Sequence, residues 1–154
     1  MPVTSVTKDP EQLTLTLVAD FPVSQRRLWE AWADPRQLER FWGPPFAPAT
    51  FTHHDFRVGG RAEYFLSGPD GEKWSGSWRF TAVDPIDSFA AEDGDGDTEE
   101  LPMAMTFVFE TTAAGSRMTS VTRFSSVAAM EATIPGMEAG LRAAMPQLDE
   151  VLAG

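Results

Sequence analysis

The first regular pattern in the chain is an alternation of hydrophobic and polar residues. Between Leu13 and Phe21 the odd positions are apolar and the even positions are mostly polar. A period of two residues predicts a strand with one buried face. Residues 1–11 before it are polar and flanked by prolines, so we expect a loose lead-in there.

Two short helices are predicted between residues 24 and 43. Ser24 is a typical N-cap, and apolar residues follow it at helical spacing. Asp34-Pro35 ends the first helix and begins the second, because Asp caps well and Pro suits the first helical position. Gly43-Pro44-Pro45 ends the second helix. The apolar positions of the pair are Leu28, Trp29, Trp32, Leu38, Phe41 and Trp42.

After the helices the pattern returns to a period of two and predicts an antiparallel meander. Turn residues separate its strands, at Gly59-Gly60, Pro69-Asp70-Gly71, Asp84-Pro85 and Ala114-Gly115. Residues 92–100 are acidic and Gly-rich and are expected to form an exposed loop. The strands are predicted over residues 50–58, 62–66, 74–82, 88–91, 103–109 and 118–124. The strand over 74–82 has an apolar face made of Trp74, Gly76, Trp78, Phe80 and Ala82.

The last part of the chain is helical. Residues 127–133 are expected to form a short lead-in, and the main helix is expected from Met137 onward. Pro146 lies inside this helix and predicts a kink, because proline lacks an N–H and clashes with the preceding turn. The apolar residues Met137, Leu141, Met145, Leu148 and Leu152 recur at helical spacing and predict one buried stripe.

This order of elements predicts one α+β domain over residues 1–154. Its expected architecture is a curved antiparallel sheet of six to seven strands that wraps around a long C-terminal helix, with two short helices after the first strand. The length of 154 residues suits one domain. A bent sheet that grips one helix leaves room between them for a ligand cavity.

Charge and composition restrict the classes of partner. The formal charge is −11, which repels phosphates and disfavours nucleic acid and anionic membrane surfaces. Cysteine is absent, so disulfides and Cys-ligated metals are excluded. The first ten residues do not have the pattern of a signal peptide, and no apolar run approaches the length of a membrane span. We therefore expect a cytoplasmic protein, and we leave a homodimer open.

Several motifs, in this order, resemble the START-like (SRPBCC, Bet v 1-like) superfamily. Within it the chain resembles the homologues of the activator of heat shock protein 90 ATPase. The resemblance covers roughly residues 13–153. It rests on Trp42-Gly43-Pro44, the run from Asp55 to Gly60, the Gly68–Gly71 hairpin with Asp84-Pro85 beyond it, and the run from Gly136 to Gly140.

The resemblance implies a helix-grip fold, often with a deep hydrophobic pocket, and it implies no shared catalytic residues. Members of the superfamily bind lipids, sterols, polyketides or hormones, and some are cyclases or dehydratases. The chaperone-activating members carry an additional N-terminal domain that has no counterpart in this sequence, so we do not expect chaperone activation here. The chain departs from the family at Leu141, where an aromatic residue is common, and at Pro146.

The candidate chemistry is limited. His53-His54-Asp55 holds the two histidines of the chain, and a metal site would need further ligands. Asp93, Asp95 and Asp97 imitate a calcium loop, but Thr98 and Ala104 occupy the positions of its Gly and Glu. Neither a metal nor a cofactor is expected. The candidate ligand-binding residues are Trp42, His54, Tyr64, Trp74, Trp78, Phe80, Met105, Phe107, Met118, Met137, Leu141 and Met145.

Three functions are therefore considered. The leading one is the binding of a hydrophobic or amphipathic small molecule between the sheet and the C-terminal helix. The second is an enzyme of the cyclase or dehydratase type that uses the same cavity, with His54, Glu63, Tyr64 or an arginine as acid–base or oxyanion group. The third is an interaction module that contacts a chaperone.

Overall fold

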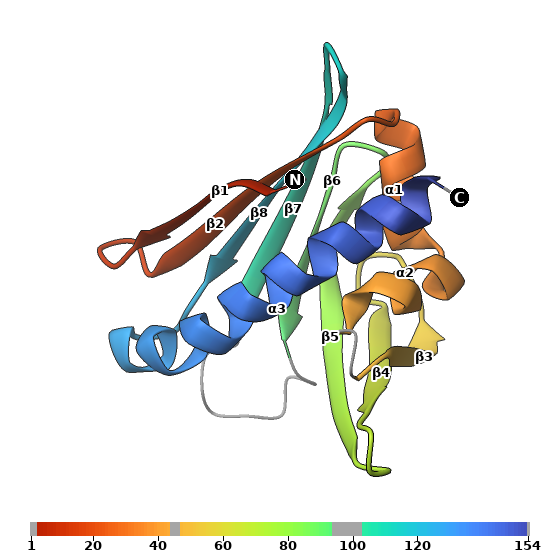
Figure 1. Cartoon of the computed structure of the whole chain (residues 1–154). Coiled ribbons are helices and arrows are strands. Elements are labelled where there is room, and N and C mark those ends of the chain that lie inside the picture. The colour runs from red at the N-terminus through yellow and green to blue at the C-terminus, as the bar shows by residue number, and fades with distance from the viewer. Residues whose placement is uncertain (1–2, 44–46, 94–102, 154) are drawn as a thin grey trace.

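The structure is a computed structural model that describes residues 3–43, 47–93 and 103–153. These residues form one antiparallel sheet of eight strands in the order β1-β2-β8-β7-β6-β5-β4-β3, together with three helices (Figure 1). The elements are β1 (Val3–Asp9), β2 (Thr14–Phe21), α1 (Gln25–Ala33), α2 (Pro35–Trp42), β3 (Ala49–His54), β4 (Arg61–Ser67), β5 (Lys73–Asp84), β6 (Ser88–Asp93), β7 (Ala104–Thr112), β8 (Gly115–Arg123) and α3 (Val127–Ala153).

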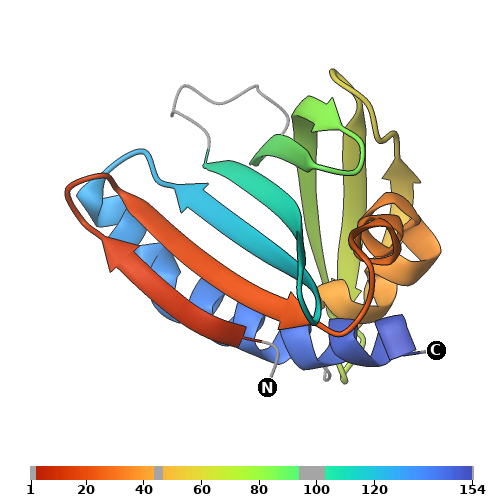
Figure 2. The same ribbon diagram turned by 90° about the horizontal axis from the view of Figure 1, so that it is seen from above.

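The sheet bends around α3, as the view from above shows (Figure 2). The long helix crosses one face of the sheet (Figures 1 and 2), where α2 contacts β3 and α1 contacts β7 and β8. This arrangement confirms the predicted α+β helix-grip fold, with eight strands in place of six or seven.

The additional strand is β1, and it corrects the expectation of a loose lead-in over residues 1–11. It pairs antiparallel with β2, from Val3 opposite Ala19 to Asp9 opposite Thr14. Val3 and Val6 are its half-buried apolar residues, while Thr4, Ser5, Thr7 and Lys8 are exposed. An edge strand held mainly by backbone pairing has no apolar alternation for sequence analysis to detect.

The two short helices begin where the sequence predicts. The Ser24 hydroxyl accepts a hydrogen bond from the N–H of Arg27 at 3.1 Å, as an N-cap does. The Asp34 carboxylate accepts from the N–H of Arg36 at 2.9 Å, and Pro35 is the first residue of α2. These caps fix where α1 and α2 begin, and they therefore help to position the aromatic residues on both helices.

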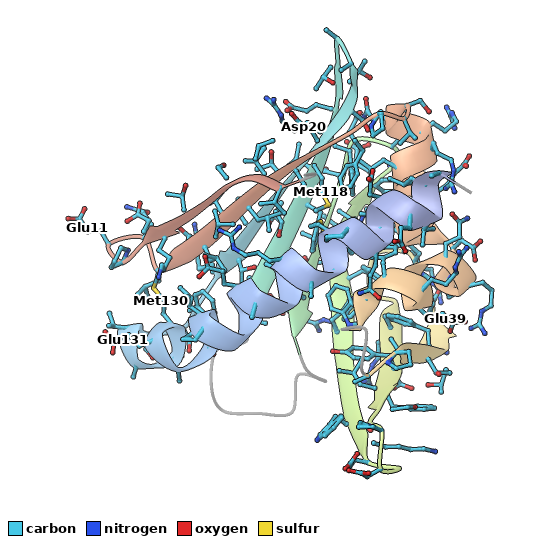
Figure 3. The ribbon with its side chains drawn as sticks, viewed as in Figure 1. Glu11, Asp20, Glu39, Met118, Met130 and Glu131 are labelled. Atoms are coloured by element: carbon cyan, nitrogen blue, oxygen red, sulfur yellow. The ribbon has the colours of Figure 1, made fainter. Side chains whose placement is uncertain are left out.

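The helix α3 is longer than predicted, since it begins at Val127 and continues to Ala153. The expected lead-in is its first part, where Met130 and Ile134 are buried against Leu15 of β2 and Phe124 (Figure 3 labels Met130). Both Pro135 and Pro146 lie inside the helix. The kink at Pro146 stays a prediction.

Two strands differ from their predicted ranges or faces. The strand β3 ends at His54, and the chain then turns through Gly59, whose φ of +83° suits glycine. In β5 the pairing with β6 shifts register between Phe80 and Ala82. This irregularity reverses the faces beyond it, so Ala82 is exposed while Val83 is half-buried, contrary to the predicted apolar face.

A filled aromatic core lies beneath α1. The ring of Trp29 meets Phe109 edge to face at 5.6 Å between centroids, and Phe89 stacks on Phe107 at 4.7 Å. Such pairs add to the free energy gained by burying apolar area. None of the described helices is both long and apolar enough to cross a membrane.

Candidate functional site

A pocket of about 380 Å³ lies between the sheet and α3, next to the filled core. Its size is near the lower end of the range for small-molecule sites, about 300–1,000 Å³. The described residues of the sheet side are Tyr64, Leu66, Trp78, Met103, Met105, Phe107, Ser120 and Thr122. The helices contribute Trp32, Phe41, Trp42, Gly136, Met137, Gly140, Leu141, Ala144 and Met145.

Most of the residues predicted as ligand-binding meet at this pocket. Side chains alternate across a strand, and residues three or four apart share one face of a helix. The predicted residues are therefore brought together from the inward positions of β4, β5 and β7 and from one flank of α3. The predicted residues that line the pocket are Trp42, Tyr64, Trp78, Met105, Phe107, Met137, Leu141 and Met145.

Four predicted residues lie elsewhere. Trp74 is 49% exposed near the tip of the β4–β5 hairpin, which extends beyond the helix layer (Figure 1). Phe80 and Met118 are buried in the filled core, and neither lines the pocket. His54 lies among the rings of Phe51, Phe56 and Phe80, also outside the pocket.

Sequence analysis missed the small and polar residues of the wall. Ser120 and Thr122 are buried on the same face of β8 as Met118, labelled in Figure 3. The period of two could have identified both, since they lie two and four residues after Met118. Gly136, Gly140 and Ala144 are spaced by four residues along α3, which places them on one flank of the helix.

The polar groups of the pocket are few and carry no charge. None of its described lining residues is an Asp, Glu, Lys, Arg or His. Trp32 and Trp78 are 2% and 4% exposed, and their buried indole N–H groups find no acceptor in the part of the chain that the structure describes. Tyr64, Ser120 and Thr122 add hydroxyl groups to the wall.

Hydrogen bonds hold the helices that form the pocket in place. Arg27 of α1 donates to the side-chain amide oxygen of Gln37 at 2.7 Å and to the backbone carbonyl of Val151 at 3.0 Å. Gln147 of α3 donates to the backbone carbonyl of Gly43 at 2.8 Å. These bonds attach the C-terminal half of α3 to α1 and to the end of α2.

The helix α2 is attached in turn to the edge strand β3. Arg36 donates to the backbone carbonyl of Phe51 at 2.9 Å, and the carboxylate of Glu39, labelled in Figure 3, accepts from the Phe51 N–H at 3.1 Å. Hydrogen bonds to β3 and to α3 therefore hold α2 in place, and Phe41 and Trp42 of this helix line the pocket.

His54 has an unusual environment for a histidine. Its ring stacks on Phe56 at 5.5 Å between centroids, and neither of its buried ring nitrogens has a hydrogen bond of good geometry within the described chain. Burial lowers the pKa of His54 below its ordinary value, while the nearby carbonyls of Trp32 and Ala33 act in the opposite direction. His54 does not line the pocket, and its burial results from packing against these aromatic rings.

Residues 3–43, 47–93 and 103–153 contain no cluster of three or more His, Cys, Asp or Glu side chains that could hold a metal ion. His53 is exposed, and Asp55 pairs with Arg57 at 2.8 Å. The predicted calcium-loop residues Asp95 and Asp97 lie outside the described residues, as does most of the acidic run over 92–100.

Comparison with known proteins identifies the relatives of this fold. The family model described as "Activator of Hsp90 ATPase homolog 1-like protein" matches residues 22–153. A search among curated proteins found no match.

Two solved structures are similar in sequence and in fold. Protein Ms6760 from Mycobacterium smegmatis is 41% identical, with a TM-score of 0.88 over 99% of this chain and 98% of that one. A protein from Arthrobacter aurescens is 42% identical, with a TM-score of 0.90 over 98% of this chain and 92% of that one. An AHSA1-like protein from Aeromonas hydrophila is 17% identical, with a TM-score of 0.73 over 91% and 92%, and shares the fold.

Proposed function

The chain belongs to the family of activator of Hsp90 ATPase homolog 1-like proteins, and from this membership and the pocket we propose that it binds a small apolar or amphipathic molecule. The site of binding is the pocket between the sheet and α3. The observation that carries the proposal is a space of about 380 Å³ whose wall is mostly aromatic and methionine side chains.

The wall suits a ligand that binds mainly by burial of its apolar surface. Each square ångström of apolar area removed from water contributes roughly 25 cal/mol, so a small aromatic or aliphatic molecule gains several kcal/mol. Met105, Met137 and Met145 adapt their shape to irregular ligands, because methionine is unbranched and flexible. The pocket volume fits a compact molecule better than a lipid with two chains.

The two alternative functions stay predictions, and of the acid–base groups considered for an enzyme only Tyr64 lines the described pocket wall. An acid–base enzyme would place ionisable groups around its substrate. His54 and Glu63 are absent from the described wall, and Glu63 instead pairs with Arg61 at 3.4 Å. The family name refers to activation of the Hsp90 ATPase, and chaperone contact would be tested separately by co-purification.

Native mass spectrometry of protein purified gently from its expression host tests the proposal. We expect a discrete adduct on the wild-type chain that organic solvent releases for identification. The variant Gly140→Leu should lose most of this adduct, because Gly140 lines the pocket and a Cβ there meets open space. Leucine also favours helix more than glycine does, so the variant should stay folded.

Ala139→Leu is the matched control. Ala139 precedes Gly140 in α3, is exposed and does not line the pocket, so this variant should keep the adduct. A bare protein mass for all three chains would contradict the proposal, and so would an adduct that Gly140→Leu retains in full.

A further inference from the structure

Two hydroxyl side chains lie on the inner face of β8, where the pocket meets the sheet. Ser120 and Thr122 are 2% and 3% exposed, and both line the pocket. They follow Met118, labelled in Figure 3, at intervals of two residues, so all three share one face of the strand. Buried positions of an interior strand are usually apolar. Hydroxyl groups at two of them beside a cavity therefore indicate a role in the cavity.

Both hydroxyls are available to a ligand. Within the described part of the chain neither of them has a hydrogen-bond partner. The Oγ of Ser116, on the same face of β8, is unpaired and fully shielded, whereas the side-chain oxygens of Ser120 and Thr122 keep some accessible surface. Because both residues are buried from the outside and line the pocket, this surface faces the interior of the pocket.

The surroundings of the two hydroxyls are apolar. Ser120 lies opposite Leu17 of β2 and Phe107 of β7, and Thr122 lies opposite Met105 of β7. An apolar molecule against this part of the wall would remove water from the hydroxyls and give them no partner, which is unfavourable. A ligand with an oxygen atom at this position avoids that loss.

The wall also restricts the charge of a ligand. Its described residues include no ionisable side chain other than Tyr64, so a bound carboxylate or phosphate would be buried without a counter-charge. The formal charge of −11 further repels anions. A cationic group would likewise find no carboxylate among these residues.

We infer that the ligand of this pocket is an uncharged molecule whose hydroxyl or carbonyl group forms a hydrogen bond with Ser120 or Thr122. This inference rests on the proposed function, because it specifies the ligand class of the same site. A serine or threonine hydroxyl both donates and accepts, so alcohols, phenols, ketones and esters all belong to this class. Burial of the apolar body supplies affinity, and the polar group at β8 fixes the orientation.

Three probes of nearly equal shape separate these contributions. 2-Acetylnaphthalene carries a ketone, 2-isopropylnaphthalene replaces it with a hydrocarbon group, and 2-naphthoate replaces it with a carboxylate. Titration calorimetry at constant salt should show the ketone binding about three- to tenfold more tightly than the hydrocarbon, as expected for one net hydrogen bond. The carboxylate should bind at least about tenfold more weakly than the ketone.

Substitutions that keep the shape of the wall identify the hydroxyls. In Ser120→Ala with Thr122→Val, the ratio of ketone to hydrocarbon affinity should fall to about one. Ser116→Ala with Thr119→Val is the matched control, because it removes the same two groups from the same strand and neither residue lines the pocket. The control should keep the wild-type ratio.

Thermal unfolding without a probe separates binding from a structural role. Replacing an unpaired buried hydroxyl by an apolar group of the same shape is nearly neutral or stabilising. The Tm of Ser120→Ala with Thr122→Val should therefore be unchanged or higher, while its preference for the ketone is lost. Loss of the preference together with a lower Tm would assign the hydroxyls to the stability of the fold and overturn the inference.

A measurement on the wild-type chain gives an independent result. The methyl protons of the bound acetyl group should show nuclear Overhauser effects to the γ-methyl group of Thr122. Effects to the rings of Tyr64 or Trp78, with none to Thr122, would overturn the inference.

The calorimetric outcomes distinguish the inference from the proposed function. Equal binding of ketone and hydrocarbon overturns the inference and leaves the proposed function in place. Tightest binding of the carboxylate also overturns the inference alone. Binding of none of the probes overturns the inference and the proposed function together.

Discussion

At the residue scale, His54 shows how packing alone changes the chemistry of a side chain. Its ring lies 5.5 Å from Phe56 and 5.7 Å from Phe80 between centroids, and its nitrogens are buried. Burial lowers the pKa of His54, and Asp34 partly opposes this effect. The unfolded chain therefore binds a proton at this site more readily than the folded chain does.

This difference predicts a pH-dependent stability. The free energy of unfolding should fall as the pH drops below the ordinary histidine pKa of about 6.5, and should level off below the lowered folded value. Each unit by which the folded pKa is lowered removes about 1.4 kcal/mol. Urea denaturation at a series of pH values between about 7.5 and 5 measures the effect.

Substitutions at the two histidines assign the effect to one of them. His54→Gln should remove the decrease in this pH range, whereas His53→Gln should keep it, because His53 is exposed. A decrease that survives His54→Gln would contradict this account. Losses at lower pH belong to carboxylates such as Asp20, whose pKa is lowered by its hydrogen bond to Arg117.

At the element scale, α3 combines a long length with several residues that weaken helices. The part of it that lines the pocket, from Gly136 to Met145, lies between Pro135 and Pro146. Each proline lacks an N–H, and each glycine in a helix interior costs about 1 kcal/mol relative to alanine. The pocket wall is thus the segment of α3 with the least intrinsic helix stability.

Pro146→Ala should therefore raise the free energy of unfolding by about 1–3 kcal/mol. Pro146 is exposed, and alanine restores an N–H that can donate to the carbonyl of Arg142. Pro22→Ala is the control, since Pro22 is exposed and lies outside any helix, and it should give no gain. Urea denaturation of both variants distinguishes the outcomes, and an unchanged or lowered stability in Pro146→Ala would refute the prediction.

Sequence analysis identified the elements whose signals are local. The caps at Ser24 and Asp34 and the period of two in β2, β7 and β8 depend on neighbouring residues alone. The strand β1 was missed because its pairing with β2 needs little apolar burial. Trp74 was predicted on the apolar face of β5, but it is 49% exposed because no described helix covers that end of the strand. Whether a helix covers a strand depends on the tertiary structure, which the local sequence pattern does not show.

At the scale of the whole molecule, the division between filled core and pocket follows the sizes of facing side chains. Beneath α1 the rings of Trp29, Phe89 and Phe109 meet and fill the space. Beneath the middle of α3, small buried residues such as Ser120 and Ala144 line the space and leave it open. Sequence analysis identified most of the large residues of the wall, but the volume between them depends on how closely α3 approaches the sheet.

The methionines provide the most direct test of where a ligand binds. The chain has 7 of them, among which Met103, Met105, Met137 and Met145 line the pocket. Met118 and Met130 are buried outside it and serve as internal controls. Selective ¹³C labelling of the methionine methyl groups gives each of these positions its own NMR signal.

Titration of this labelled protein with 2-acetylnaphthalene tests whether a small apolar molecule binds between the sheet and α3. We expect saturable shifts of the Met103, Met105, Met137 and Met145 methyl signals through the ring currents of the bound probe, while the signals of Met118 and Met130 keep their positions. Methyl signals that stay unchanged at saturating probe, or saturable shifts confined to Met118 and Met130, would contradict ligand binding between the sheet and α3.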